Sequence, residues 1–350
     1  MSTAQAFNKQ VAFIVGWLII FSGVVGTATV ALGFAGYFHA LVEAPIFPSA
    51  LVLVLLLSAI LFIGIEQSAR MAMAFTLIEA FGLILIIVAG FPYYGSVDYL
   101  EMPLGFSGIF QGAALIFFAY LGFEEIVKLA EETKEPERTI PIGLMLAVSA
   151  SIILYIFVAF SAVSILGWQP LSQSSAPLAD IASAALGKNA FIVLSIIALF
   201  ATSNTVLLML LAASRITYGM AESSLPRILS KIHLRTRTPW MAILGTTVMT
   251  IVFILLNDIG YLAGITDFTV FITFVVINGS LIVLRYKQAD VYRPFQVPIA
   301  LGRFPLPPLL GLFFNIFMLI QLSVTVLALG TLLVIVGILV SLMLKGNMDT

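Results

Sequence analysis

The sequence has no cysteine and only two histidines, His39 and His233, among its 350 residues. Disulfides and thiolate metal sites are therefore excluded, and two distant histidines do not favour a metal centre or a catalytic triad. Charge is also scarce, because only 9% of the residues are charged and 61% are hydrophobic. A soluble domain carries about a quarter charged residues. The chain is therefore predicted to be an all-α polytopic membrane protein with no metal and no cofactor.

Ten apolar stretches approach or exceed the roughly 20 residues that a helix needs to cross a bilayer. They cover residues 11–40, 47–65, 71–91, 108–129, 141–167, 190–220, 240–257, 261–284, 304–323 and 326–344. Only a weak break at residues 321–325 separates the last two. With a cytoplasmic N-terminus, all 16 lysine and arginine residues except Lys188 fall on the cytoplasmic side, as the positive-inside rule requires. We therefore predict a multi-pass protein of the plasma membrane with its N-terminus in the cytoplasm.

The connections between the spans give two further expectations. The segment 177–189 is too short to cross a bilayer and has apolar residues at helical spacing, so we expect a helix at the outer interface or over an outer vestibule. The loop 225–239 carries Arg227, Lys231, Arg235 and Arg237. Because it joins two spans on the cytoplasmic side, it is predicted to face anionic lipid and not nucleic acid.

Small residues recur every four positions in the first span, at Gly23, Thr27, Ala31 and Ala35. Such a face lets helix backbones approach closely in lipid. Close helix packing is the expected role, and lining of a substrate route is the alternative.

The stretch 117–143 reads FFAYLGFEEIVKLAEETKEPERTIPIG. Its apolar run stops at Gly122, a residue that favours interruption of a helix, and Glu124 follows within one turn. A break inside the bilayer leaves carbonyl and N–H groups that need partners. Transporters use such half-helix ends to hold charged groups of a substrate: the carbonyls suit an ammonium, and the N–H groups suit a carboxylate. The stretch therefore predicts a broken transmembrane helix that holds a small zwitterion.

The same stretch resembles the signature of the amino acid–polyamine–organocation (APC) superfamily, which is close to F-x-A-Y-x-G-F-E followed by A-E-E-x-x-x-P-x-x-x-I-P. Residues 201–229 are similar to that family's eighth helix and the loop after it. Residues 281–298 carry its L-R…R-P-F-x-x-P signal, and residues 13–21 resemble its third helix.

This resemblance implies a LeuT-like fold of two inverted five-helix repeats and two accessory helices, with the solute at the midplane. Residues 1–350 would form a single transporter domain. Within it, 11–91 would be the remainder of the first repeat, 108–284 the second repeat and 304–344 the accessory helices. Since 11–40 matches the third helix, we expect a fold truncated at the N-terminus, without the first two helices and the Gly-rich segment that binds the substrate carboxylate.

The resemblance also implies substrate-binding positions at Phe118, Ala119, Tyr120, Leu121, Gly122 and Glu124. Phe118 would be an aromatic gate over the substrate, with ordinary helix packing as the alternative, and the next four residues would act through their backbone. Glu124 would close an inner gate or orient the substrate amine. The alternative for this acid is a solvated side chain paired with Lys128 at i,i+4 spacing.

Glu79 lies in the middle of an apolar span, where an acid costs about 2.5–3.5 kcal/mol. The family sometimes has a lysine here, so that lysine mechanism does not carry over. Glu79 either carries a coupling proton, because removal from water favours a neutral carboxyl, or is a structural acid bonded to a neighbouring helix. The resemblance places Thr202, Ser203 and Asn204 opposite it as a cation or proton site, with interhelical hydrogen bonding as the alternative. Asp267 is predicted to be an interface residue within reach of water.

These features predict a secondary active transporter that moves amino acids or related amines by alternating access, through proton symport or amino acid exchange. Its expected partners are an amino acid substrate, protons or a counter-transported amino acid, and the lipid bilayer. The alternative is a truncated, non-transporting remnant that acts as a structural or interaction partner. An enzyme is not expected, because the sequence has no G-x-S-x-G nucleophile motif and no histidine-rich metal set.

Overall fold

The computed structural model describes residues 2–64, 69–123, 133–288, 291, 297, 299–302 and 304–344. The helices are α1 (Ser2–Ala6), α2 (Lys9–Val42), α3 (Ile46–Ile63), α4 (Ala69–Gly90), α5 (Gly105–Ile116), α6 (Pro136–Leu166), α7 (Trp168–Gln173), α8 (Pro177–Leu186), α9 (Lys188–Ala221), α10 (Trp240–Ile254), α11 (Ile259–Lys287), α12 (Leu306–Gln321) and α13 (Val324–Met343). Short 3₁₀ turns are η1 (Phe91–Tyr93), η2 (Phe117–Tyr120) and η4 (Arg227–Ser230). One small antiparallel hairpin pairs β1 (Ala300–Leu301) with β2 (Phe304–Pro305).

The described residues contain seven helical stretches that are long and apolar enough to cross a membrane. They are α2, α3, Met73–Tyr93, α6, α9, α11 and α13. The three other predicted spans correspond to shorter apolar helices, Gly105–Tyr120, Trp240–Ile254 and Leu306–Gln321. The protein is thus an all-α polytopic membrane protein.

Two boundaries show how proline and serine set the ends of these helices. Helix α6 begins at Pro136, five residues before the predicted start, and it contains Pro141. A proline fits the first helical position because no partner is needed for its nitrogen. The weak break expected between the last two spans is confirmed, since α12 ends at Gln321 and Ser323 caps α13 by accepting a hydrogen bond from the Val326 amide.

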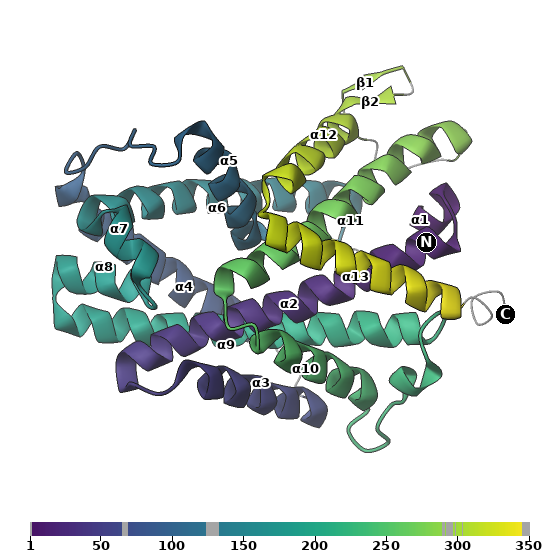
Figure 1. The fold of residues 1–350 in the computed structure, drawn as a ribbon, viewed down its shortest axis with the longest axis horizontal. Coiled ribbons are helices and arrows are strands. Elements are labelled where there is room, and N and C mark those ends of the chain that lie inside the picture. Colours follow the sequence, from purple (N-terminus) through teal and green to yellow (C-terminus); the bar gives the residue numbers. More distant parts are fainter. Residues whose placement is uncertain are drawn as a thin grey trace.

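Helix α2 runs through the centre of the molecule and packs against α9, α11, α3 and α10 (Figure 1). The small residues predicted for its packing face make this approach possible. A Cβ added at Gly23 would lie 2.9 Å from the Cβ of Ala213 on α9. Thr27, Ala31 and Ala35 are fully buried. This face is therefore a packing surface, and it does not line an open route.

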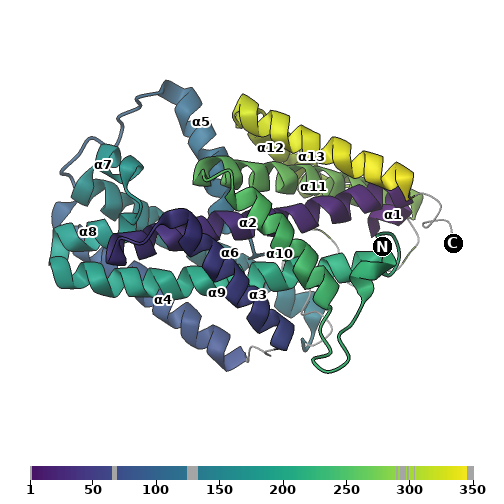
Figure 2. The same cartoon turned by 60° about the horizontal axis from the view of Figure 1, so that its bottom comes forward.

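Helix α5 lies between two groups of helices in both views (Figures 1 and 2). One group contains α4, α6, α7 and α8, and the other contains α11, α12 and α13. Helix α5 packs against α11 and α12. The short helix α8, predicted from residues 177–189, packs against α4, α6 and α9. Helix α1 and the C-terminal end of α13 lie at the same end of the molecule (Figures 1 and 2).

Candidate functional site

The predicted break in the fourth apolar stretch is present at residues 117–122. Helix α5 ends at Ile116, and a single 3₁₀ turn follows it. Leu121 is then extended, and Gly122 has a φ of +112°. Residues with a side chain rarely adopt this left-handed region, whereas glycine enters it without steric cost. Gly122 is therefore the residue that lets the chain leave the helix here.

Tyr155 of α6 satisfies one of the carbonyls that the break leaves without a helical partner. Its hydroxyl donates to the Ala119 carbonyl at 3.2 Å, and its ring lies 5.2 Å from that of Tyr120. Within the turn, the Leu121 amide donates to the Phe118 carbonyl at 3.2 Å. The break is thus tied to α6. Sequence reasoning missed Tyr155, although a lone phenol in the middle of a long apolar helix is a signal for a polar partner.

Phe274 of α11 holds the two sides of the break together. The ring of Phe117, before the break, lies 6.4 Å from the Phe274 ring, and the ring of Phe123, after it, lies 6.1 Å away. Phe117 also contacts Phe271 at 4.9 Å. Aromatic pairs at these separations attract one another. Residues on both sides of the interruption therefore pack against α11.

Glu79 of α4 and Asn204 of α9 lie together, as the resemblance implies. The Asn204 side chain forms a hydrogen bond with the Glu79 carboxylate. The other oxygen, Oε1, is buried and has no hydrogen-bond partner within the described ranges. Tyr155 lies within electrostatic reach of both Glu79 and Tyr120. Tyr155 therefore contacts the broken segment and lies near the Glu79–Asn204 pair.

Thr202 and Ser203 use their hydroxyl protons within their own helix. The Thr202 hydroxyl donates to the Ala198 carbonyl at 2.6 Å, and the Ser203 hydroxyl donates to the Leu199 carbonyl at 2.6 Å. Each oxygen keeps lone pairs that can accept a hydrogen bond or face a cation. In the part of the chain that the structure describes, no three His, Asp or Glu side chains come together as metal ligands.

The sequence analysis also predicted positions for two further acidic residues, Glu124 and Asp267. Glu124, expected at an inner gate, lies outside the described residues. Asp267 was expected at an interface within reach of water, and this expectation is wrong, because its side chain is fully buried (0% exposed). Asp267 lies only eight residues after Ile259, the first residue of α11, which suggests an exposed level, but α11 packs against α2, α5, α12 and α13. Those helices exclude water from a position that looks peripheral in sequence.

The sequence that forms this broken helix also matches a known family. The profile described as amino acid permease matches residues 1–343. The chain belongs to the amino acid permease family. This family lies within the APC superfamily that the sequence motifs resemble, and it implies a LeuT-like fold and amino acid substrates. Because the family is one of transporters, the protein is not an enzyme.

Three curated relatives extend over most of the chain. The branched-chain amino acid permease BcaP of Bacillus subtilis is 28% identical over 345 residues, which cover 92% of this chain and 73% of that protein. The methylthioribose transporter of the same organism is 29% identical, covering 83% of this chain and 68% of that protein. Cationic amino acid transporter 2, vacuolar, of Arabidopsis thaliana is 27% identical, with 81% of this chain and 48% of that protein covered.

Proposed function

We propose that this protein is a secondary active transporter that moves amino acids or related amines across the membrane by alternating access. The observation that carries the proposal is the interruption of an apolar helix at residues 117–122. Half-helix ends inside a bilayer present unpaired carbonyls and N–H groups, which suit the two charged groups of an amino acid. The position of α5 between two helix groups supports the proposal, because those groups can move relative to one another.

The substrate would lie against the interrupted segment. Its ammonium would face carbonyls at the end of the first half-helix, and its carboxylate would face N–H groups beyond Gly122. Phe118 would close over it as an aromatic gate. The proposed binding set is Phe118, Ala119, Tyr120, Leu121, Gly122 and Glu124.

Coupling to protons or to a counter-transported amino acid would involve the Glu79 cluster. A carboxyl with one buried, unpaired oxygen can exchange a proton when a helix moves and water enters. The hydrogen bond to Asn204 and the proximity of Tyr155 support this role, because they connect Glu79 to the segment that would bind the substrate. Thr202 and Ser203 would supply oxygen atoms on the same helix as Asn204.

The proposed architecture has ten membrane crossings within one domain of residues 1–350. The three shorter apolar helices would cross as well, with 11–91 belonging to the first LeuT-like repeat, 108–284 to the second, and 304–344 to the accessory helices. The N-terminus would be cytoplasmic and the protein would lie in the plasma membrane. The distribution of lysine and arginine supports this orientation, since only Lys188 would face outward.

The test is transport in proteoliposomes that contain the complete product of the gene. The relatives are named for branched-chain and cationic amino acids, so radiolabelled leucine and lysine are the first probes, and glutamate is the acidic comparison. Uptake driven by a pH gradient, or counterflow against the unlabelled amino acid, is expected for at least one probe. The proposal would be contradicted if neither activity were seen in a protein whose cooperative thermal unfolding transition shows that it is folded.

A pair of variants tests the role of Glu79. Glu79→Gln keeps the shape and removes the proton, so we expect loss of gradient-driven uptake. Glu43→Gln makes the same chemical change at an exposed position at the end of α2, and we expect wild-type uptake. Equal uptake by the two variants would remove Glu79 from the coupling mechanism.

A further inference from the structure

Asp267 of α11 is the one acidic or basic side chain that is fully buried in the described part of the chain. Its carboxyl lies alongside the backbone of Phe118 in the interrupted segment. Neither carboxyl oxygen completes a hydrogen bond with any described residue. An ionised carboxylate in such a place loses its hydration, and the nearby backbone of Phe118 compensates for only part of that loss. The group therefore needs a positive charge bound to it.

No neighbouring side chain supplies that charge among the residues that the structure describes. The elements that pack against α11 are α1, α2, α5, η2, α12, α13 and β2, and α5, α12 and α13 contain no charged residue. The titratable groups on these elements are Lys9 and His39 at the ends of α2, Tyr120 of η2, Asp258 at the N-cap of α11, and Tyr261, Arg285, Tyr286 and Lys287 on α11 itself. At 1.5 Å per residue, Arg285 lies about 27 Å along the helix from Asp267. Tyr37 of α2 is turned toward α8, where its hydroxyl accepts from the Leu178 amide.

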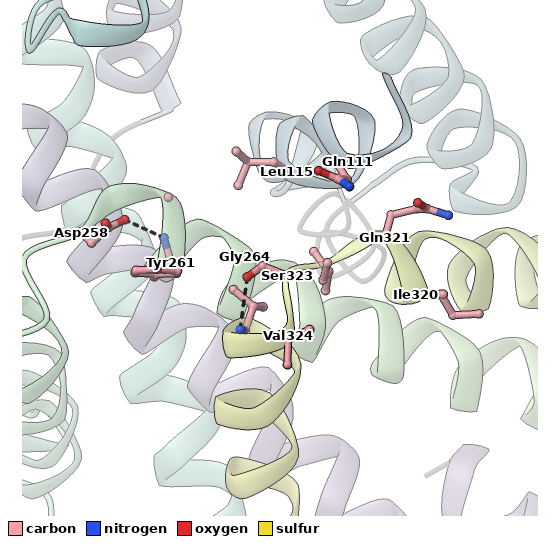
Figure 3. Close-up of a pocket in the computed structure, with 12 residues that line it drawn as sticks. Gln111, Leu115, Asp258, Tyr261, Gly264, Ile320, Gln321, Ser323 and Val324 are labelled. Atoms are coloured by element: carbon pink, nitrogen blue, oxygen red, sulfur yellow. Dashed lines mark hydrogen bonds between the residues drawn. The ribbon is translucent and has the colours of Figure 1, made fainter. Parts of the chain in front are cut away.

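A cavity of about 570 Å³ lies beside the first turns of α11 (Figure 3). Gln111 and Leu115 of α5 line one side, and Tyr261 and Gly264 of α11 line another. The link between α12 and α13, residues 320–324, forms the remaining wall. Asp267 follows Gly264 by three residues and Phe118 follows Leu115 by three, so the contact between them lies about one helical turn below the cavity.

We propose that Asp267 is a proton-binding site, separate from Glu79, that is loaded from this cavity. A metal ion does not fit, because Ca²⁺ and similar ions require six or more oxygen ligands. The adjacent Thr266 and Thr269 hydroxyls donate to carbonyls of their own helix, and even with their remaining lone pairs they and the two carboxyl oxygens would supply only four ligands. A substrate amine does not fit either, because the side chain is fully buried. A proton needs no space and neutralises the group.

This site would couple protonation to the position of the broken segment. With the proton bound, α11 can remain packed against Phe117 and Phe118, as the structure shows. After release of the proton, the ionised carboxylate requires water, which can reach it only if α5 and α11 separate from the cavity side. Because Phe274 supports both ends of the break, that separation would also move the segment proposed to bind the substrate. The inference therefore rests on the proposed transport function.

Transport by Asp267→Asn tests the site, because asparagine preserves the shape and cannot release the proton. The probe is a pH gradient, acid outside, across proteoliposomes with the amino acid that gives the strongest wild-type counterflow. We expect complete loss of gradient-driven accumulation and persistence of counterflow, which needs no net proton movement. Asp98→Asn, in an outer loop away from this cavity, is expected to retain both. Accumulation by Asp267→Asn at the wild-type level would overturn the proposal, as would joint loss of accumulation and counterflow in a folded variant.

Infrared spectroscopy separates this inference from the proposed function. A protonated carboxyl gives a carbonyl band that shifts on deuteration, and this band should be present in the wild type and absent from Asp267→Asn. The band should remain in Glu79→Gln. Inactive wild-type protein that still shows the Asp267-dependent band would contradict the transport proposal alone. Spectra that do not differ between the wild type and Asp267→Asn across an acid-to-alkaline titration would overturn the proton site.

Discussion

Replacing Gly122 with alanine measures how far the break depends on its left-handed backbone. A Cβ added at Gly122 would meet no atom of the described residues within 4 Å, so the substitution creates no clash with them. Its cost comes from the φ of +112°, and holding a residue with a side chain in a sparsely populated region costs about 1–3 kcal/mol. Since each factor of ten corresponds to about 1.36 kcal/mol, transport that requires this conformation should fall about 5- to 150-fold.

Gly112→Ala is the matched control for that substitution. Gly112 lies in α5, ten residues before Gly122, and its added Cβ also meets nothing within 4 Å in the described part of the chain. Its backbone is helical, so alanine should stabilise α5 by about 0.5–1 kcal/mol. Both variants would be assayed by counterflow in proteoliposomes and by thermal unfolding in detergent. Equal counterflow by the two variants would refute the assignment of the break to the backbone of Gly122.

Three further substitutions test the packing around the break and the core. Tyr155→Phe removes one hydrogen bond, worth about 0.5–1.5 kcal/mol, and should lower the rate of uptake while the unfolding midpoint stays nearly constant; unchanged uptake would contradict its role. Phe274→Ala removes two aromatic contacts, worth about 0.5–1.5 kcal/mol each, and should lower the unfolding midpoint. Gly36→Ala would place a Cβ 2.5 Å from the Ser175 carbonyl oxygen, whereas the Cβ of Gly33→Ala would have no described atom within 4 Å. Only Gly36→Ala should therefore destabilise the protein, and equal unfolding midpoints would contradict that packing.

The broken helix could be predicted because its cause is local. Gly122 follows an apolar run and precedes acidic residues, and the preference of glycine for positive φ acts within one residue. The partners of the break could not be predicted in the same way. Tyr155 lies 36 residues from Ala119 along the chain, and Phe274 is more than 150 residues from the segment that it supports. Helix packing brings these residues to the break, and the local sequence pattern does not indicate these long-range contacts.

The two buried acids show the same contrast. The resemblance to a family with a known helix arrangement places Glu79 opposite the helix that contains Asn204, and the two side chains do meet. For Asp267, position along the span suggests exposure to water, which is wrong. Burial at this level depends on α5, α12 and α13, which cover α11 from different parts of the sequence. The sequence of one span does not indicate which other helices will pack over it.

Hydrogen exchange of backbone amides tests most directly whether the interrupted segment binds an amino acid. The protein would be placed in lipid nanodiscs, and exchange would be compared with and without the amino acid that gives the strongest counterflow. The account predicts slower exchange at residues 117–123 and at Tyr155, with little change in the first turns of α5. Unchanged exchange at residues 117–123 under saturating amino acid, with protection located elsewhere, would contradict the proposed binding site.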